Sequence, residues 1–522
     1  MYATVPTAAL LGVEALRVRV EVHVHPGMPK VVITGLPDSA IREAIPRVFS
    51  AARMQGFPIE LTKRVVINLV PGDLRKSGSA FDLPIALGLL AAMGRCDPER
   101  LARTLVLGEL TLEGRVAAVR GVLVMVSPDP AGGSRSRPGE SIDQVLVPRE
   151  NQLEAVLGAG CPVVAVGTLR EAVDHISGTR TLDPLVPGEC EIPRTVDAGA
   201  PDLRDVRGQT QARRALEIAA AGGHNLLLVG SPGSGKTLLA HRLAGILPRL
   251  ASGEALEVSR IHSVAGLLPR DGGLLSHRPF RSPHASISDA GLLGGARAPH
   301  VGELSLAHRG VLFLDEFPEF RRSALEHLRQ PLEDGWVQIV RAGLSVRLPA
   351  RITLVAAMNP CPCGYLGDPR RSCRCSPFQV ERYTARLSGP ILDRIDLQVE
   401  VPSLSLEELM DQRESEDSQT VRSRVEEAVH RQRHRYRGDT RLFSNAGLDR
   451  SGLKAWCPLD EASLALLRRV ADRFRLSARS VDRVVKVART VADLHGRDAI
   501  GSAELAEAVQ LRIRDTRSQL QE

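Results

Sequence analysis

Residues 226–237 read Leu-Leu-Leu-Val-Gly-Ser-Pro-Gly-Ser-Gly-Lys-Thr, and this stretch decides the fold around it. The four apolar residues predict a buried strand, and a helical pattern begins directly after Thr237. The spacing G-x-x-x-x-G-K-T lets successive backbone N–H groups point at phosphate oxygens, and the helix N-terminus adds positive potential. The residues expected to bind a nucleotide are Gly230, Ser231, Pro232, Gly233, Ser234, Gly235, Lys236 and Thr237.

Two of these residues have distinct expected roles. Lys236 would reach the β- and γ-phosphates of ATP or GTP, and Thr237 would present its hydroxyl to Mg²⁺. The alternative is a glycine-rich turn followed by Lys-Thr by chance. The strand before the loop and the helix after it argue against that alternative.

Composition places the chain among ordinary globular proteins. Its 522 residues are too many for one core, and 43% hydrophobic with 25% charged residues is typical of such proteins. No stretch approaches the ~20 apolar residues that span a bilayer, and Met1–Pro6 does not begin a secretory signal. We therefore expect a cytoplasmic protein without a membrane segment, whose eight cysteines are not structural disulfides.

The net charge of +7 mildly favours a polyanionic partner such as DNA. A basic protein without such a partner is equally compatible with this charge. Aromatic residues make up only 3% of the chain, which argues against base stacking as the main mode of binding nucleic acid.

The pattern along the chain predicts a multidomain α/β fold. Residues 1–185 alternate β-rich and helical stretches, and the proline-rich segment 186–201 is typical of a linker. Residues 202–401 have an α/β pattern with strands near 226–229, 311–314 and 352–357. Residues 402–522 are helical almost throughout, with helices expected over 420–436, 460–474, 478–495 and 502–514.

A pair of acids completes the expected nucleotide site. The apolar run 311–314 ends at Asp315 and Glu316. Acids at a strand end are often helix caps, but here they follow a phosphate-binding loop in a second central strand. Asp315 would hold Mg²⁺, and Glu316 would act as general base on the attacking water.

Three later positions add to this site. Asn359 follows the strand near 352–357 and could orient the water or the γ-phosphate, although a turn residue before proline is also possible. Arg394 could neutralise transition-state charge at a neighbouring subunit's site, and Arg386 competes for that role. Arg479 lies in the first turn of a helix for which Ser477 is the expected N-cap.

Together these residues resemble the AAA+ ATPases over roughly residues 200–515. The resemblance implies that Asp315-Glu316 corresponds to the Walker B motif, Asn359 to sensor 1, Arg394 to the arginine finger and Arg479 to sensor 2. It also implies an α/β core, a helical lid and a hexameric ring with ATP and Mg²⁺ between subunits.

Two insertions narrow the choice among families of AAA+ ATPases. A long segment, 252–309, contains Phe280-Arg281-Ser282-Pro283-His284, and residues 336–348 predict a hairpin with Arg341 near its tip. Such a hairpin could point into the channel of a ring, or be a solvent-exposed edge. With the run 358–364, Met-Asn-Pro-Cys-Pro-Cys-Gly, these features resemble the ComM/YifB family of magnesium chelatase-like AAA+ proteins.

That family implies an N-terminal domain with the Lon-protease-type fold, related to ribosomal protein S5 domain 2. Lon-type peptidases use a Ser–Lys dyad. Aligning the peptidase pattern with residues 76–82 places the nucleophile on Ala80, and the dyad lysine falls near Leu123. No lysine occurs between Lys76 and Lys236, so we expect a scaffold or substrate collar and not a protease.

Four of the eight cysteines lie within fifteen residues, in a pair of C-x-C motifs. Thiolates at this density suit tetrahedral Zn²⁺, and free thiols or a regulatory disulfide are the alternatives. The expected role of the metal is structural, and its ligands would be Cys361, Cys363, Cys373 and Cys375.

Three functions remain open at this point. The resemblance favours a hexameric DNA motor that performs branch migration during recombination or natural transformation. A chaperone that remodels proteins, as in magnesium chelatase, is the alternative, and an ATP-dependent protease is a weaker third. The basic run 430–437 is compatible with DNA contact but is more typical of a solvated helix face.

Overall fold

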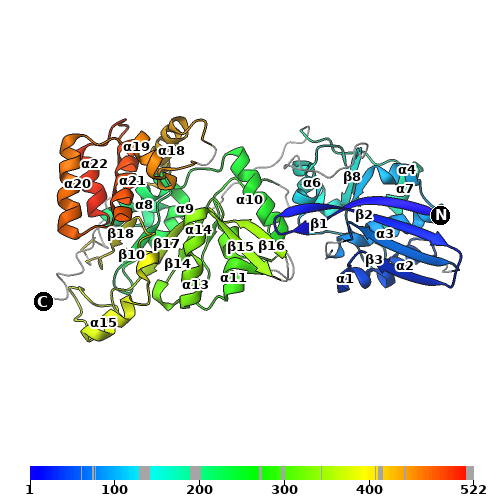
Figure 1. Cartoon of the computed structure of the whole chain (residues 1–522), viewed down its shortest axis with the longest axis horizontal. Coiled ribbons are helices and arrows are strands. Elements are labelled where there is room, and N and C mark those ends of the chain that lie inside the picture. The colour runs from blue at the N-terminus through cyan, green and yellow to red at the C-terminus, as the bar shows by residue number, and fades with distance from the viewer. Residues whose placement is uncertain are drawn as a thin grey trace.

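A computed structural model describes residues 1–522 except 60–61, 73–75, 77, 129–140, 189–200, 270–272, 296–299, 342–343, 406, 409–414, 440–441 and 513–522. The N-terminal part and the remainder of the chain lie end to end along the long axis of the molecule (Figure 1). Residues 189–200, which make up most of the predicted linker 186–201, are not among the described residues. Leu185 still belongs to the N-terminal part, since its backbone exchanges two hydrogen bonds with Val163.

The N-terminal part is built on two sheets. In the first sheet, the order is β1-β2-β4-β3, and only β3 and β4 are parallel. Its strands bury alternate residues against α3, every residue of which is buried. The strands are β1 (Tyr2–Leu11), β2 (Glu14–His25), β3 (Lys30–Thr34) and β4 (Arg64–Val70), and the helices are α1 (Ser39–Arg42), α2 (Ala44–Met54) and α3 (Asp82–Ala92).

The second sheet of this part is parallel, in the order β5-β8-β9, and a short β6–β7 pair lies beside it in sequence. Its elements are β5 (Thr104–Val106), β6 (Glu109–Leu110), β7 (Val116–Ala117), β8 (Gln144–Pro148), β9 (Val163–Val166), α4 (Pro98–Ala102), α5 (Val122–Val126), α6 (Gln152–Gly158) and α7 (Leu169–Ser177).

The central part contains a five-stranded parallel sheet in the order β11-β14-β17-β10-β18. Alternate residues of β10 face opposite cores: Leu226 and Leu228 enter one cluster, Leu227 and Val229 the other. The strands are β10 (Leu226–Val229), β11 (Phe280–Arg281), β14 (Val311–Leu314), β17 (Thr353–Met358) and β18 (Leu397–Glu400). The expected strands are present, with β17 starting one residue later than predicted.

Helices and short strands surround this sheet. They are α8 (Thr210–Gly222), α9 (Lys236–Ile246), α10 (Ser252–Ala265), α11 (Asp289–Leu293), α12 (Glu303–Leu306), α13 (Arg322–His327), α14 (Arg329–Asp334), α15 (Pro377–Thr384), α16 (Gly389–Leu392), β12 (Gly294–Gly295) and β13 (His300–Val301).

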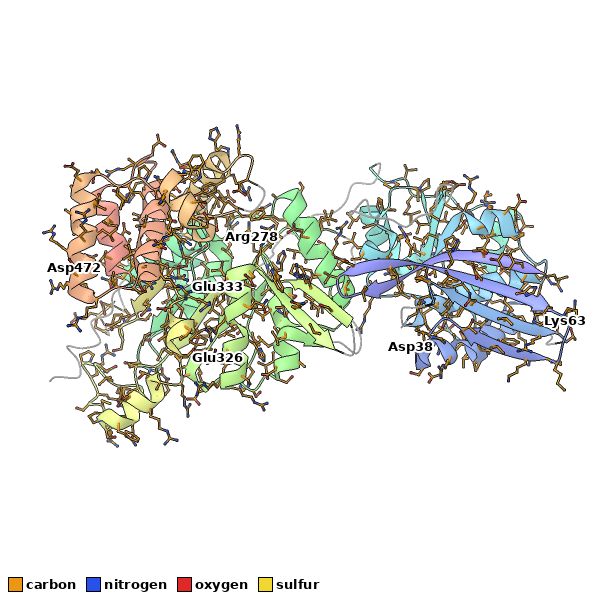
Figure 2. The ribbon with its side chains drawn as sticks, in the orientation of Figure 1. Asp38, Lys63, Arg278, Glu326, Glu333 and Asp472 are labelled. Carbon is orange, nitrogen blue, oxygen red and sulfur yellow. The ribbon has the colours of Figure 1, made fainter. Side chains whose placement is uncertain are left out.

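The C-terminal part is helical and shares one hydrophobic core with the central sheet. Helix α18 packs on α8 and α9, and α21 packs on α8, α18 and α22. Its helices are α18 (Ser418–Arg435), α19 (Arg450–Trp456), α20 (Glu461–Phe474), α21 (Ala478–Leu494) and α22 (Ser502–Gln510). Figure 2 places Asp472 on α20, at the end of the molecule opposite Asp38 and Lys63 of the N-terminal part. The predicted multidomain α/β fold with a helical C-terminal region is confirmed.

The predicted hairpin is present and lies at the junction with the N-terminal part. Strands β15 (Trp336–Arg341) and β16 (Leu344–Pro349) pair antiparallel (Figure 1). The side chain of Val346 lies so close to Gly12 that an added Cβ there would be 2.3 Å from it. A small apolar cluster joins Val124 of α5 to Ile261 and Val264 of α10. The N-terminal part is therefore held to the rest of the chain by side-chain packing on α10 and on the hairpin, in addition to the covalent link between them.

Candidate nucleotide site

Three parallel strands deliver the predicted phosphate-binding loop, the acid pair and Asn359 to one edge of the central sheet. Val229 of β10 pairs with Met358 of β17, and Leu314 of β14 pairs with Ala356. The residues after each strand therefore emerge side by side: the phosphate-binding loop, the acid pair and Asn359. In parallel α/β sheets, ligands bind at the carboxyl ends of the strands, which is where these residues lie.

The phosphate-binding loop has the backbone that its glycines allow. Gly233 and Gly235 have φ values of +78° and +92°, which residues with a Cβ rarely adopt. Lys236 is 8% exposed and its Nζ donates to the carbonyls of Gly230, at 2.7 Å, and Ser231, at 2.8 Å. Burial lowers the pKa of Lys236, while the charge of Asp315 acts in the opposite direction. The ammonium group thus sits inside the loop with polar partners that a phosphate could replace.

The loop and the acid pair are joined by a direct contact. The hydroxyl of Thr237 donates to Oδ2 of Asp315 at 2.7 Å. Glu316 has a φ of +52°, and its N–H donates to Oδ1 of Asp315 at 2.9 Å. This turn leaves the carboxylate of Glu316 exposed beside the half-buried Asp315. A hydroxyl and a carboxylate at this distance match the oxygen ligands that Mg²⁺ takes beside substrate phosphates.

Asn359 lies within reach of the same lysine. Its Oδ1 accepts a hydrogen bond of 3.3 Å from Nζ of Lys236. Tyr383 of α15 hydrogen-bonds the backbone of Asn359, and burial raises the pKa of this tyrosine to about 12. The structure therefore brings Lys236, Thr237, Asp315, Glu316 and Asn359 together from segments that are far apart in the sequence.

Arg394 lies elsewhere. It is 6% exposed, its guanidinium forms an ion pair with Glu333 of α14, and it donates to the backbone carbonyls of Arg329 and Pro390. The competing Arg386 is exposed and forms an ion pair of 2.8 Å with Glu319. Figure 2 shows Glu333 between the C-terminal helices and the hairpin. Within one chain, therefore, Arg394 has a structural partner and does not contact the phosphate-binding loop.

Arg479 is exposed in the first turn of α21, and Ser477 caps that helix by accepting from the N–H of Ser480. One turn later, Arg483 forms an ion pair with Asp396. Asp396 precedes β18, whereas the phosphate-binding loop follows β10 at the other end of the same pair of strands. A four-residue strand spans about 13 Å, so Arg394 and the start of α21 lie at the opposite edge of the sheet from Lys236.

Asp396 is a residue that the sequence pattern did not single out. It is 2% exposed, with Nδ1 of His224 at 3.4 Å from its Oδ2, and it accepts from the N–H of Asn225 at 3.1 Å. Burial disfavours its charge, but the close contact with His224 and the charge of Arg483 hold the pKa of Asp396 below its ordinary value. His224 also contacts Thr490 of α21 at 2.7 Å. This buried network fastens the C-terminal helices to the sheet.

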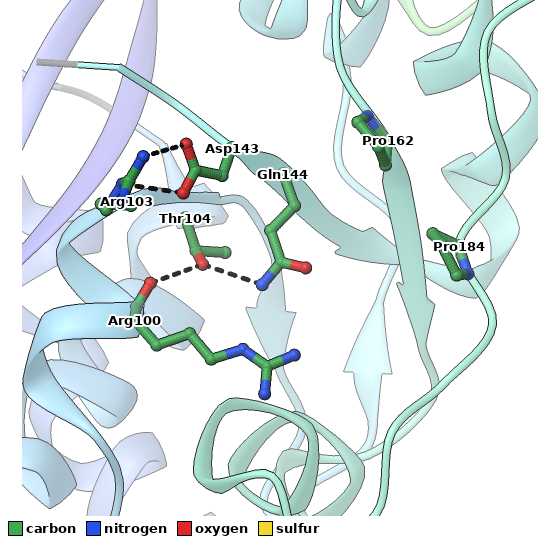
Figure 3. A pocket seen from close by; sticks show the side chains of 7 residues that line it. All are labelled: Arg100, Arg103, Thr104, Asp143, Gln144, Pro162 and Pro184. Atoms are coloured by element: carbon green, nitrogen blue, oxygen red, sulfur yellow. Dashed lines mark hydrogen bonds and ion pairs between the residues drawn. The ribbon is translucent and has the colours of Figure 1, made fainter.

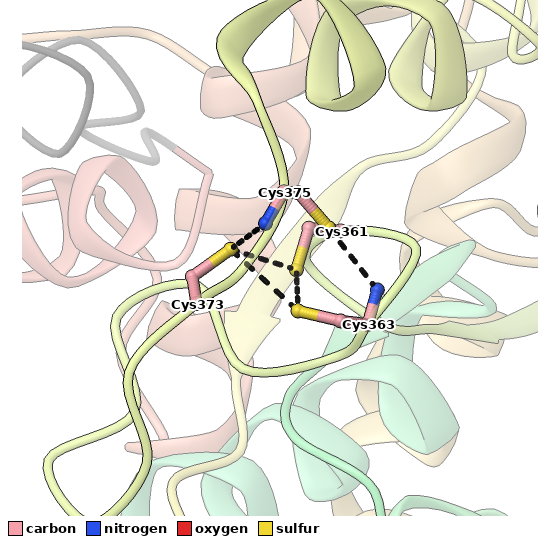
Figure 4. A group of neighbouring side chains, drawn as sticks. All are labelled: Cys361, Cys363, Cys373 and Cys375. Carbon is pink, nitrogen blue, oxygen red and sulfur yellow. Dashed lines mark hydrogen bonds between the residues drawn. The ribbon is translucent and has the colours of Figure 1, made fainter.

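The four clustered cysteines converge on one point (Figure 4). Their sulfur atoms all lie within 4.8 Å of one another. Burial raises the pKa of Cys363, but N–H groups of Arg374 and Tyr365 outweigh it and lower that pKa to about 6, whereas burial raises the pKa of Cys373 to about 12. Cys96, Cys161 and Cys457 lie outside the cluster. The arrangement offers four sulfur ligands to a soft cation.

The N-terminal part offers no comparable constellation at the positions aligned with a peptidase. Lys76 is fully buried and its Nζ donates to the carbonyl of Gly35, while the hydroxyl of Ser79 contacts the carboxylate of Glu109. Ala80 follows in a 3₁₀ turn and Leu123 is buried in α5. Ser79 thus donates its hydroxyl hydrogen bond to the carboxylate of Glu109 and not to a lysine.

A pocket of about 280 Å³ lies in the same part, beside β5 and β8 (Figure 3). Its polar groups bond to one another: Gln144 donates to Thr104 at 3.0 Å, and Arg103 pairs with Asp143 at 2.7 Å.

The described helices are each too short or too polar to cross a lipid bilayer. Within the basic run 430–437, Gln432 is fully buried and Arg435 pairs with Asp493, while Arg431 and Arg433 are exposed. Only part of this run is therefore available to a partner. The predicted hairpin residue Arg341 ends β15, and its side chain lies outside what the structure describes.

Three family models match most of the chain. Residues 202–409 match the family described as magnesium chelatase, subunit ChlI. Residues 20–151 match subunit ChlI of Mg-chelatase, and residues 415–512 match the C-terminal region of magnesium chelatase subunit ChlI.

Individual relatives extend this result. The uncharacterized protein YifB of Escherichia coli strain K12 is 41% identical over 516 residues, which cover 98% of this chain and 97% of that protein. The competence protein ComM of Haemophilus influenzae is 40% identical over 518 residues, with the same coverage of both. The magnesium-chelatase 38 kDa subunit of Rhodobacter capsulatus is 27% identical over 48% of this chain and 63% of that protein. The residues gathered at the strand ends and the near full-length likeness to YifB and ComM lead to one conclusion: the chain belongs to the ComM/YifB family of magnesium chelatase-like proteins.

Proposed function

We propose that the chain is an ATP hydrolase that works as a ring-shaped motor on DNA. The observation that carries the proposal is the hydrogen bond of 2.7 Å between Thr237 and Asp315, which joins the two halves of a Mg²⁺–triphosphate site across 78 residues of sequence. Bound Mg²⁺ would neutralise charge on the phosphates. Thr237 and Asp315 would hold that ion, and Lys236 would exchange its two carbonyl partners for phosphate oxygens.

The remaining residues at this edge account for hydrolysis. Glu316 is exposed next to Asp315, so its carboxylate can accept a proton from a water molecule that attacks the γ-phosphate. Asn359 reaches Lys236 at 3.3 Å, which places its amide close enough to orient that water or the γ-phosphate. ATP and Mg²⁺ are accordingly the cofactors that we propose.

A second subunit completes the site in this proposal. Arg394 and Arg479 lie at the sheet edge opposite Lys236, so neither is positioned to act on its own chain's nucleotide. A head-to-tail ring, which we take to be a homohexamer, would present that edge to the neighbour's phosphate-binding loop. Arg394 would then leave Glu333 to act as the finger and Arg479 would act as sensor 2, with Arg386 as the competing finger.

Several observations favour DNA as the substrate. The chain carries a net charge of +7, and its likeness to the competence protein ComM extends over nearly its whole length. The hairpin exposes Val340 and holds Arg347 4.5 Å over the ring of Trp336. We propose a cytoplasmic branch-migration helicase, active in recombination or natural transformation, whose hairpins contact DNA.

Protein remodelling is the alternative, and the likeness to the Rhodobacter chelatase subunit favours it over part of the chain. It predicts a protein partner and an ATPase rate that DNA does not change. We further propose that residues 1–185 form a Lon-like scaffold without peptidase activity. Peptide cleavage that Ser79→Ala abolishes would contradict this.

The decisive experiment measures ATPase activity with no DNA, with linear duplex and with a four-way junction, and measures strand exchange on the junction in parallel. The DNA motor predicts faster hydrolysis with the junction and ATP-dependent branch migration. Lys236→Ala should lose both activities, and Lys454→Ala serves as an exposed lysine control. An ATPase rate that is the same with and without each DNA, together with no branch migration, would favour the remodelling alternative.

A further inference from the structure

The segment between β17 and α15 runs for eighteen residues, 359–376, without a helix or strand, although all of it is described. Loops of this length inside a folded core are uncommon without a function or a covalent or metal staple. The segment also leads directly from Asn359 of the nucleotide site to Cys361, which is fully buried. Its conformation is therefore coupled to the strand end that carries the site.

The sulfur geometry in this segment fits a metal. Sγ of Cys361 lies 3.4 Å from that of Cys363 and 3.6 Å from that of Cys373, and the sulfurs of Cys363 and Cys373 are also 3.6 Å apart. In a tetrahedron with metal–sulfur bonds of about 2.3 Å, neighbouring sulfurs are about 3.8 Å apart. The fourth sulfur, of Cys375, accepts from the N–H of Cys363 at 3.4 Å. These separations are those of ligands around one ion.

The same segment rests on the phosphate-binding loop. Gly364 is buried with a φ of +86°, and an added Cβ would lie 2.5 Å from Cδ and 2.6 Å from Cγ of Pro232. Only a glycine fits this close approach. The contact places the backbone between the two cysteine pairs directly against the loop expected to hold phosphate.

Asp368 adds a polar link at the same place. The side chain of Ser231 in the phosphate-binding loop interacts with the carboxyl of Asp368 and lowers its pKa. Oδ1 of Asp368 accepts from the N–H groups of Arg370 and Arg371 at 2.8 and 3.1 Å, and its Oδ2 accepts from the hydroxyl of Ser403 at 3.4 Å. One carboxylate therefore ties the cysteine segment to the phosphate-binding loop and to the chain that follows β18.

We propose that Cys361, Cys363, Cys373 and Cys375 bind a zinc ion that holds Gly364 and Asp368 against the phosphate-binding loop, so that zinc occupancy sets the affinity for nucleotide. Loss of the ion removes the staple from an otherwise irregular segment. Pro232 and Ser231 then lose their support, and the loop no longer presents its N–H groups in a fixed array. The inference rests on the proposed function, because it assumes that nucleotide binds at Lys236.

The test uses the full-length protein and four variants. The double variant Cys373→Ser/Cys375→Ser removes two of the four sulfur ligands, whereas Asp368→Ala removes the carboxylate link and keeps all four sulfurs. Cys161→Ser is the control, because Cys161 is a half-buried cysteine outside the cluster. Lys236→Ala removes the ammonium group expected to bind phosphate. Zinc per chain is measured by elemental mass spectrometry, and affinity by titration with a fluorescent ATP analogue. Far-UV circular dichroism reports whether each variant is folded.

We expect one zinc per chain in the wild type, in Asp368→Ala and in Cys161→Ser, and none in the double cysteine variant. Nucleotide affinity should fall about tenfold or more in both the double variant and Asp368→Ala, since a hydrogen bond to a charged group is lost or misplaced, and stay unchanged in Cys161→Ser. Zinc removal from the wild type by a chelator should weaken binding, and zinc addition should restore it. That reversible arm tests the proposal even if the double variant does not fold.

Metal-free wild-type protein, or cysteines that form disulfides under reducing purification, would overturn the zinc site. Zinc-containing wild type whose affinity is the same after chelation and in Asp368→Ala would overturn the coupling, while loss of binding in Lys236→Ala would leave the proposed function standing. Wild-type protein that binds zinc but no nucleotide would instead contradict the proposed function.

Discussion

Mixing two inactive variants tests where Arg394 acts. In Lys236→Ala the phosphate-binding loop lacks its cation but Arg394 is intact, and in Arg394→Ala the reverse holds. Because the two residues lie at opposite edges of the sheet, one chain cannot place both at one nucleotide. Each variant alone should be inactive, and removing an arginine finger costs about 10³–10⁵-fold in turnover.

The expected recovery follows from this geometry. In a ring assembled from equal amounts of both variants, half of the phosphate-binding loops are intact and half of the neighbours supply an arginine. About one quarter of the sites should therefore be complete, and the ATPase rate should reach about one quarter of the wild-type rate if sites act independently. The assay is steady-state ATP hydrolysis at fixed total protein over a series of mixing ratios, with a maximum expected at equal amounts.

The structural role of Arg394 requires its own control. Glu333→Gln removes the ion-pair partner but leaves the arginine in place. If Arg394 acts on the neighbour's nucleotide, Glu333→Gln should retain most of the activity. A mixture no more active than its better component, or a Glu333→Gln variant as inactive as Arg394→Ala, would refute the reasoning.

Three further outcomes are expected. Glu316→Gln should keep ATP binding but slow single-turnover hydrolysis about 10²–10⁴-fold, whereas the exposed Glu319→Gln should not; equal slowing of both would contradict the general-base role. Asp396→Asn should lower the unfolding free energy of the C-terminal helices by about 3–5 kcal/mol, measured by calorimetry, because it leaves buried partners uncompensated. The folded pKa of Asp396 is depressed, so its contribution is present above its unfolded pKa of about 4 and is lost as pH falls through the folded value. The gap between wild type and Asp396→Asn should accordingly narrow in acid, and a constant gap would exclude this account. Ile261→Ala should weaken the junction by about 2–5 kcal/mol and speed limited proteolysis between the N-terminal part and the rest; an unchanged rate would show that α10 does not hold it.

Much of the candidate nucleotide site could be assembled from the sequence because its parts are local. A strand, a glycine loop and a helix start are consecutive in sequence, and the positive φ of Gly233 and Gly235 is available only to such residues. The apolar run before Asp315 marks a second strand for the same reason, and parallel strands bring their carboxyl ends together. The boundaries of α18, α20 and α21 were also close, since these helices begin at the capping side chains Asp417, Asp460 and Ser477, whereas α19 was not expected.

Other features had no local signal. The sequence presented Arg394 and Arg479 as members of the site but could not show that both lie at the far edge of the sheet, because that depends on the order of strands and the docking of α21. Asp396 and His224 meet across 172 residues, and neither was assigned a role from the sequence. Asp368 looked like one more loop residue between two cysteine pairs.

By itself, therefore, the sequence was enough to identify the family and to predict a phosphate-binding role for the loop 230–237 and four sulfur ligands, because short-range backbone geometry and side-chain chemistry carry these signals. Only the tertiary structure showed that Arg394 lies at the sheet edge opposite Lys236, that the C-terminal helices are fastened through the buried carboxylate of Asp396, and that the cysteine segment packs on Pro232. Those features arise from packing between segments remote in the chain, where the sum of many weak contacts sets the arrangement and no single residue pattern records it.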